Sequence, residues 1–170
     1  MGLKGRVMEL LRAGDEQALG ALAAREPRTA RFLLGRLWDP DEAMRRHAAW
    51  AFGKAAASHP EIGLDLLRRL MWALNDESAT NGLYGITAVA EIGLNDPELV
   101  APFIAPLASL SWDDDLRLEI ISALRRIAEA APEAVRPVCQ RIAEHVDFED
   151  PDERQVFERL LEESGVIDET

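Results

Sequence analysis

The sequence has 170 residues, with 19 lysines and arginines against 31 aspartates and glutamates, and its formal net charge is −12. This length fits one domain, residues 1–170, and an apolar content of 48% excludes disorder over the whole chain. The acidic balance argues against a nucleic-acid partner, because cations are needed to bind phosphates.

Taken in chain order, the apolar residues recur at helical spacing, and polar or proline-containing breaks separate them. Leu64, Leu67, Leu70 and Leu74, for example, fall on one face of a helix. Strand signals are nearly absent, since aromatic residues make up only 6% of the chain. The sequence therefore predicts an all-α fold. The expected helices span 3–13, 15–25, 27–37, 41–58, 60–74, 82–94, 97–110, 114–130, 133–146 and 152–164.

Four aspartates recur at an interval of 37 residues, each in a polar break between helices: Asp39, Asp76, Asp113 and Asp150. A pair of helices of this size cannot bury its apolar face alone, whereas stacked pairs share that face with their neighbours. We therefore expect a right-handed α-solenoid of about five antiparallel helix pairs with a continuous core. The best-matching repeats are 27–59, 60–96, 97–131 and 132–165.

The segment 39–54 resembles HEAT-like repeats of the type named after phycobilisome lyases. It has the Asp-Pro start, the apolar–Arg pair and the small residues that end in Gly53-Lys54. The segment from Asp113 is similar to a second copy, and the segment from Asp150 to a degenerate third. In this pattern the aspartate can cap the second helix, and an arginine one or two turns later can bond back to the turn. Residues 72–78 (WALNDES) look like a signature of uncharacterised bacterial HEAT-like proteins.

The turn from Asn75 to Gly82 departs from the repeat pattern. No lysine or arginine occurs between Leu70 and Leu116, so the expected arginine is missing. One interpretation is a recognition or cation-binding loop, and the other is a capped helix junction. For partner binding this turn contributes four candidates, Asn75, Asp76, Glu77 and Ser78.

Aromatic residues form the second group of candidates. Trp38, Trp72, Trp112 and Phe148 each lie shortly before a periodic aspartate, so stacked repeats would place them near one edge. They would then form a docking ridge, because tryptophan is favoured at binding hot spots. The alternative is that they fill the core between helix pairs, which is the commoner role of such residues. The same two interpretations apply to Trp50 and Tyr84 on second helices.

The residue types that usually form catalytic or metal-binding sites are not grouped in the sequence. His47, His59 and His145 have no metal-binding spacing, and no glycine-rich phosphate loop is present. Cys139 is the only cysteine, so an internal disulfide and a multi-cysteine zinc site are excluded and a reducing compartment is expected. We predict no catalytic residues, no metal and no cofactor. The sequence also lacks a secretory signal and a membrane-spanning stretch, which predicts a cytoplasmic protein without a membrane partner.

Charge differs in sign between the two ends of the chain. Residues 1–37 contain seven basic and four acidic groups, whereas residues 147–170 contain two and ten. This asymmetry suggests either head-to-tail association or a cationic partner, and the simpler alternative is a polar cap on the last repeat. The sequence does not specify the oligomeric state.

The leading hypothesis is a non-enzymatic scaffold that binds another protein through the candidates above. The alternative, which rests on the resemblance alone, is a lyase-like or chaperone-like protein that acts on a chromophore-bearing or cofactor-bearing protein. DNA repair is a third class, but it would require a basic groove that this sequence lacks.

Overall fold

A computed structural model describes residues 1–74 and 80–167, and the side chains of these residues except 80–83. The described residues form helices and contain no strand, which confirms the all-α prediction. The helices are α1 (Leu3–Ala13), α2 (Glu16–Arg25), α3 (Thr29–Leu34), α4 (Glu42–Ser58), α5 (Pro60–Leu74), α6 (Thr80–Asn95), α7 (Pro97–Ala108), α8 (Asp114–Ala128), α9 (Pro132–Val135), α10 (Cys139–Ala143) and α11 (Pro151–Glu163).

Eight of the ten expected spans agree with the structure to within two residues at either end, and two are corrected. The expected helix 133–146 is divided into α9, a 3-10 turn and α10. Pro137 lies in that turn, where its ring and its missing N–H disfavour a continuous α-helix. The expected helix 27–37 is only the six-residue α3, which ends at Leu34 and is followed by turns over residues 35–38.

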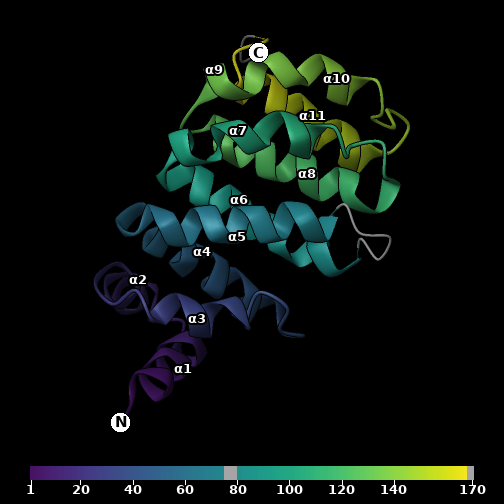
Figure 1. Cartoon of the computed structure of the whole chain (residues 1–170). Helices are drawn as coiled ribbons and strands as arrows, with labels where there is room; N and C mark the ends of the chain where they lie inside the picture. The colour runs from purple at the N-terminus through teal and green to yellow at the C-terminus, as the bar shows by residue number, and fades with distance from the viewer. Residues whose placement is uncertain (75–79, 168–170) are drawn as a thin grey trace.

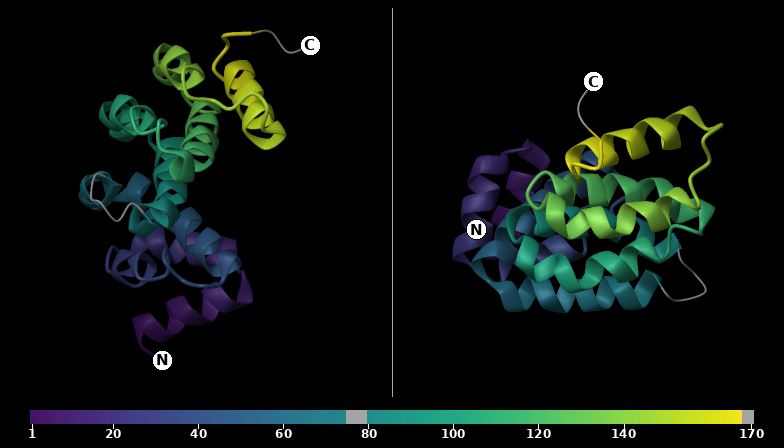
Figure 2. Two further views of the ribbon diagram at one scale, coloured as in Figure 1. Left: turned by 90° about the vertical axis from the view of Figure 1, so that its right-hand side faces the viewer. Right: turned by 90° about the horizontal axis from the view of Figure 1, so that it is seen from above.

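The helices form two layers (Figure 1; Figure 2, left). One layer contains α2, α4, α6, α8 and α11, and each of these packs against the next in chain order. The other layer contains α3, α5, α7 and the α9–α10 segment, while α1 packs on α2, α3 and α4 at the N-terminal end. The connections from α3 to α4, α7 to α8 and α10 to α11 lie along one edge, on the right of Figure 1.

Small residues bring the long helices close together. Ala48, Ala55 and Ala56 of α4 are buried, and Gly53 faces the backbone of α6. A Cβ on Gly53 would lie only 2.6 Å from the carbonyl oxygen of Glu91, so a larger residue cannot fit without moving a helix. Larger apolar side chains fill the space between the two layers, among them Leu67, Leu70, Ile86, Ile92, Leu107, Ile120 and Ile121.

Three helices begin with the same arrangement of an aspartate and an arginine. The carboxylates of Asp41, Asp113 and Asp150 accept hydrogen bonds from backbone N–H groups in the first turns of α4, α8 and α11. In each of these helices the arginine four residues after the capping aspartate donates a hydrogen bond to a backbone carbonyl oxygen. That carbonyl belongs to the residue six positions before the arginine. These arginines are Arg45, Arg117 and Arg154.

The predicted capping aspartate and back-bonding arginine are therefore present, with one correction. Asp113 and Asp150 are caps, but in the first copy the cap is Asp41 rather than the periodic Asp39. Asp39 instead accepts hydrogen bonds from the backbone N–H of Asp41 and from Arg36. Asp76 lies outside the described residues. Within residues 1–74 and 80–167, no helix combines the length and the apolar character needed to cross a bilayer.

Candidate functional site

A largely apolar surface cavity lies between α3 and α5 and has a volume of about 480 Å³. Trp38 and Trp72 both line it, although they are 34 residues apart in the sequence. A second cavity of about 300 Å³ adjoins it and shares three of its lining residues. We call the two cavities together the tryptophan groove. Its lining residues are Pro27, Ala30, Arg31, Leu34, Trp38, Phe52, Ile62, Asp65, Leu66, Arg68, Arg69, Leu70, Trp72 and Ala73.

The groove exists because α3 is short. Helix α5 packs on α4, α6 and α7, whereas α3 packs on α4 and scarcely touches α5. Since α3 ends at Leu34, it does not cover the second half of the much longer α5. Leu66 and Leu70 of that half are buried against the rest of the chain, and together with the exposed ring of Trp72 they line a depression that α3 leaves uncovered.

The aromatic residues that precede the periodic aspartates are exposed. The exposed fractions of Trp72 and Trp112 are 74% and 62%, and Trp38 and Phe148 are exposed as well. The alternative in which these residues fill the core is therefore wrong. The structure brings Trp38 and Trp72 together in one groove, but Trp112 does not line it. Phe148 instead packs edge-on against the buried ring of Phe157 at a centroid distance of 6.1 Å.

The charged residues of the tryptophan groove are mainly cationic. They are Arg31, Arg68, Arg69 and Asp65. Arg69 pairs with Asp65 across one turn of α5 at 3.0 Å. No described carboxylate lies within ion-pair distance of Arg31 or Arg68. The groove thus presents positive charge in a chain whose net charge is −12.

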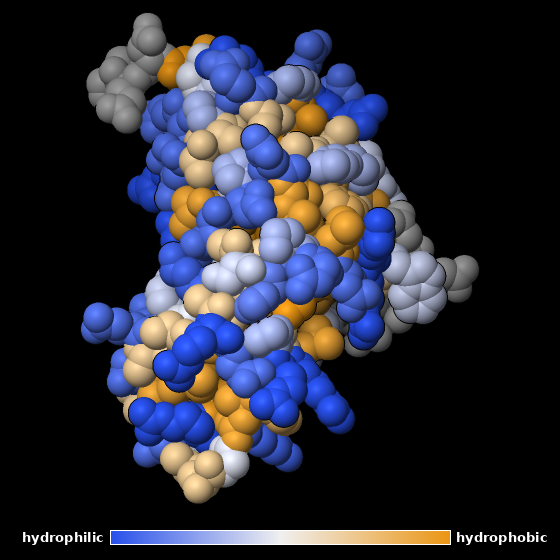
Figure 3. Space-filling model, turned by 60° about the vertical axis from the view of Figure 1, so that its left-hand side comes forward, coloured by the Kyte–Doolittle hydropathy of each residue, from blue (hydrophilic) through white to orange (hydrophobic). Residues whose placement is uncertain are grey.

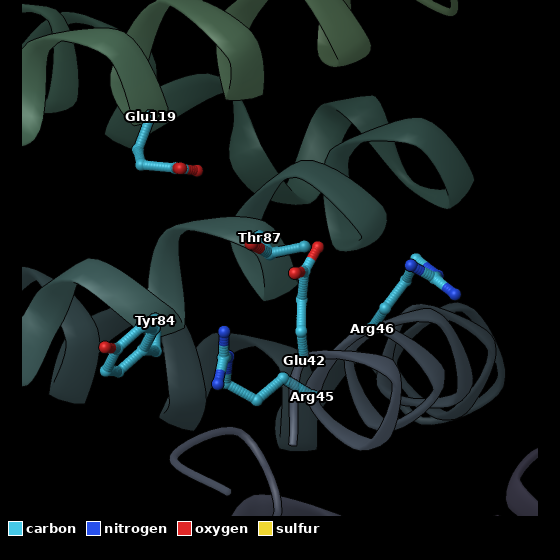
Figure 4. Close-up of a pocket in the computed structure, with 6 residues that line it drawn as sticks. All are labelled: Glu42, Arg45, Arg46, Tyr84, Thr87 and Glu119. Atoms are coloured by element: carbon cyan, nitrogen blue, oxygen red, sulfur yellow. The ribbon is translucent and has the colours of Figure 1, made fainter. Parts of the chain in front are cut away.

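A separate cavity, which we call the charged groove, lies between α4, α6 and α8 and has a volume of about 370 Å³. Figure 4 shows Glu119 projecting from α8 on one side and Arg45 and Glu42 from α4 on the other. Its full lining is Glu42, Arg45, Arg46, Tyr84, Thr87 and Glu119. Two arginines and two glutamates give this groove no preference for either sign of charge.

The electrostatics of the charged groove depend on Arg45. Its guanidinium is held by the carbonyl oxygens of Asp39 and Pro40 and lies 4.4 Å from the centroid of the Tyr84 ring. Partial desolvation raises the pKa of Glu119, repulsion from Glu42 raises it further, and Arg45 partly offsets both. Glu119 is thus a carboxylate without an adequate counter-charge.

Trp50 and Tyr84, the two candidates on second helices, are in different environments. Trp50 is half-buried in the face between α2 and α4, where Gly20 leaves room for its ring. The Lys54 ammonium lies 5.4 Å from the Trp50 ring centroid. Tyr84 is exposed in the charged groove. Neither residue contributes to the tryptophan groove.

The contact between Arg117 of α8 and Glu153 of α11 was not predicted from sequence. Both side chains are about nine-tenths buried, and their charged atoms are 3.3 Å apart. Arg117 also donates to the carbonyl oxygens of Ser111 and Trp112 and pairs with Asp114. Glu153 also accepts from the backbone N–H of Asp147. Arg117 and Glu153 lie at helix starts in successive repeats, and that periodic position was the available signal.

The remaining candidates provide no reactive site. Asn75, Asp76, Glu77 and Ser78 lie outside the described residues, so their role in partner binding stays a prediction. In the part of the chain that the structure describes, no three histidine, cysteine, aspartate or glutamate side chains are grouped to hold a metal ion. His59 bonds to the carbonyl oxygen of Ala24 and therefore serves packing. Cys139 is buried, and this burial raises the pKa of its thiol.

Comparison with known proteins gives little functional information. No family model matches the chain. A segment of 112 residues, which is 65% of the chain, is 30% identical to an uncharacterized protein of Archaeoglobus fulgidus. The matching segment covers 60% of the archaeal protein, so the chain spans less than two thirds of the length of this relative.

Proposed function

We propose that the chain is a HEAT-like α-solenoid that acts as a non-enzymatic scaffold and binds another protein. The two helix layers support the solenoid, because each long helix packs on the next in chain order. The aspartate cap and back-bonding arginine at the starts of α4, α8 and α11 also support it, since one local device recurs in successive units.

The single observation that carries the binding function is the pairing of Trp38 and Trp72 in one apolar groove. A tryptophan that is 74% exposed adds little to folding, since water still covers most of its ring. The Trp72 ring and the 38%-exposed Trp38 beside a preformed depression are the kind of anchor that concentrates binding energy at interfaces. The groove lies on α3 and α5, which the long helix α4 supports from behind.

The mechanism is docking on a rigid surface. A partner side chain would enter the cavity between Leu66, Leu70 and Trp72, and the rims of α3 and α5 would exclude water around it. A typical interface of ~800 Å² per partner extends beyond the groove. Asn75, Asp76, Glu77 and Ser78 follow α5 in the sequence, and their part in partner binding stays a prediction separate from the groove.

The test compares two tryptophans of similar exposure. The wild-type chain, Trp72→Ala and Trp112→Ala are used as baits in cells of the source organism, and captured proteins are quantified by mass spectrometry. We expect a protein that wild type and Trp112→Ala retain and that Trp72→Ala loses, with direct binding confirmed from purified components.

The loss should amount to at least roughly tenfold in affinity, as for other tryptophan hot spots. Circular dichroism provides the control that Trp72→Ala is folded. If Trp72→Ala binds every captured protein as well as Trp112→Ala does, the tryptophan groove is not the binding surface.

A further inference from the structure

We propose that the tryptophan groove takes an acidic peptide segment of a partner protein, anchored by one aliphatic or aromatic side chain. This inference rests on the proposed function and adds the chemical class of the partner. It follows from two properties of the same groove, its apolar floor and its cationic rim.

The apolar floor requires an apolar anchor. Leu34, Leu66, Leu70 and Ala73 line the larger cavity together with the two tryptophans. A volume of about 480 Å³ is sufficient for one large side chain. Leu66 and Leu70 are already covered within the chain, so the exposed apolar surface of the cavity comes from the two tryptophans and from the partly exposed Leu34 and Ala73. A wholly charged segment would leave this surface in contact with water and gain little from it.

The cationic rim requires acidic neighbours for that anchor. Arg68 lies on the rim of the larger cavity and Arg31 on that of the smaller one, and neither has a described carboxylate within ion-pair distance. Among the described lining residues Asp65 is the only acidic one, and it already pairs with Arg69. The carboxylates of a docked segment would therefore pair with the guanidinium groups of Arg31 and Arg68. Each carboxylate–arginine pair can form two parallel hydrogen bonds.

The net charge of the chain does not prevent such docking. At physiological ionic strength charges more than ~8 Å apart are largely screened, so the arginines at the groove dominate the field that a docked segment experiences. The same charge argument predicts that an acidic segment binds the tryptophan groove rather than the charged groove. In the charged groove Glu42 and Glu119 offset Arg45 and Arg46, so an acidic segment has no reason to prefer it.

The experiment begins with a random peptide library displayed on phage and selected on the immobilised full chain. Selected peptides are retained when they lose binding to Trp72→Ala and keep binding to Trp112→Ala. We expect these peptides to combine one large apolar residue with aspartate or glutamate on either side. If the Trp72-dependent peptides are neutral or basic, this inference is overturned while the proposed function stands.

Charge reversal provides the second readout, with synthetic versions of the selected peptides. The double variant Arg31→Glu/Arg68→Glu should weaken binding by at least roughly tenfold, as expected for two charge-assisted contacts. Arg141→Glu is the matched control, because Arg141 is exposed on α10, away from the groove. The double variant should also prefer a peptide whose acidic residues are replaced by lysine. Equal binding of the acidic peptide to the double variant and to wild type contradicts the inference.

A second copy of the chain is the competing occupant. The chain has its own acidic segment with exposed apolar residues, Val166 and Ile167, after Glu162 and Glu163. A synthetic peptide of residues 158–170 (ERLLEESGVIDET) is therefore included. If it binds with Trp72-dependent affinity equal to the selected peptides, and the chain self-associates at the same concentration, the occupant is a second copy and the partner claim falls. A library that returns no Trp72-dependent peptide overturns this inference, whereas the proposed function falls only if the capture experiment shows no Trp72-dependent partner.

Discussion

The α8–α11 junction and the tryptophan groove both contain arginines beside apolar side chains, but they use them in opposite ways. At the junction Arg117 is buried and has four partners within the chain. In the groove Arg31 and Arg68 are exposed and have no described carboxylate at ion-pair distance. A buried, paired arginine fixes two helices to each other, whereas an exposed one beside an open cavity is available to a partner.

The length of the neighbouring helices decides which of the two arises. Helix α11 has 13 residues and packs along α8, so the arginine of α8 is covered. Helix α3 has six residues and leaves half of α5 uncovered. The comparison therefore predicts that changes at the junction affect stability and not binding, and that changes at the groove do the reverse.

The largest effect is expected at the junction. Glu153→Ala leaves the buried Arg117 guanidinium with the exposed Asp114 as its remaining carboxylate partner and should reduce the free energy of unfolding by ~3 kcal/mol, the low end for a broken buried pair. Urea unfolding monitored by circular dichroism measures this loss. Glu158→Ala removes an exposed carboxylate from the same helix and is the control. Similar losses in both variants would show that the buried pair does not close the junction.

A smaller loss is expected where the long helices approach most closely. Gly53→Ala places a Cβ 2.6 Å from the carbonyl oxygen of Glu91, so α4 and α6 must separate, at a cost of ~1–3 kcal/mol. Gly35→Ala is the matched control, because nothing lies within 4 Å of the Cβ position there. Thermal unfolding of the two variants should therefore diverge. An unchanged midpoint for Gly53→Ala would contradict the close packing of these helices.

At the groove the stability change should be small. Trp72→Ala removes a side chain that is 74% exposed and should change the free energy of unfolding by less than ~0.5 kcal/mol. The same urea titration that is used for Glu153→Ala measures it. A loss comparable to that of Glu153→Ala would mean that Trp72 serves the fold, and the contrast between the two regions would fail.

The smallest effect concerns Glu119 in the charged groove, which contrasts with the paired Glu153. Because the folded-state pKa of Glu119 is raised, the folded chain binds more protons than the unfolded chain as pH passes from the ordinary carboxyl range to the raised value. Stability therefore falls as pH rises through this window. Glu119→Gln removes the ionised form and should be slightly more stable than wild type at pH 7.

This advantage should vanish below about pH 4, where the carboxyl group is neutral in both states. Urea titrations at the two pH values, with Glu158→Gln as the exposed control, measure the difference. A Glu119→Gln variant that is less stable than wild type at pH 7 would show that Glu119 has a favourable partner.

Local sequence signals predicted the helices well, because periodicity and proline act within a few residues. The spans of α4 and α5 agree with the predicted ones to within one residue. The early end of α3 was missed, since Gly35 is compatible with a helix and its φ of −67° is helical. That missed boundary is what opens the groove, so the cavity itself could not be predicted from local pattern, whereas the 37-residue period did predict that Trp38 and Trp72 lie near one edge.

The exposure of the candidate residues could not be predicted from the local sequence either. Their exposure depends on which neighbouring helix covers them, and the sequence does not contain that information locally. The preference for core burial of Trp72 and Trp112 was therefore wrong, although their common position before the periodic aspartates was recognised. The pairing of Arg117 with Glu153 was missed for the same reason, because the two residues lie 36 positions apart in the sequence.

The most direct test of the central claim, that the tryptophan groove is the binding surface, is chemical-shift mapping of the backbone amides by NMR. An acidic peptide selected on the wild-type chain is titrated into the isotope-labelled protein. We predict that the largest shifts fall on α3 and on the second half of α5, between Leu66 and Leu74. Largest shifts on α4, α6 and α8 around Tyr84 and Glu119 would contradict the account, because they would place binding in the charged groove.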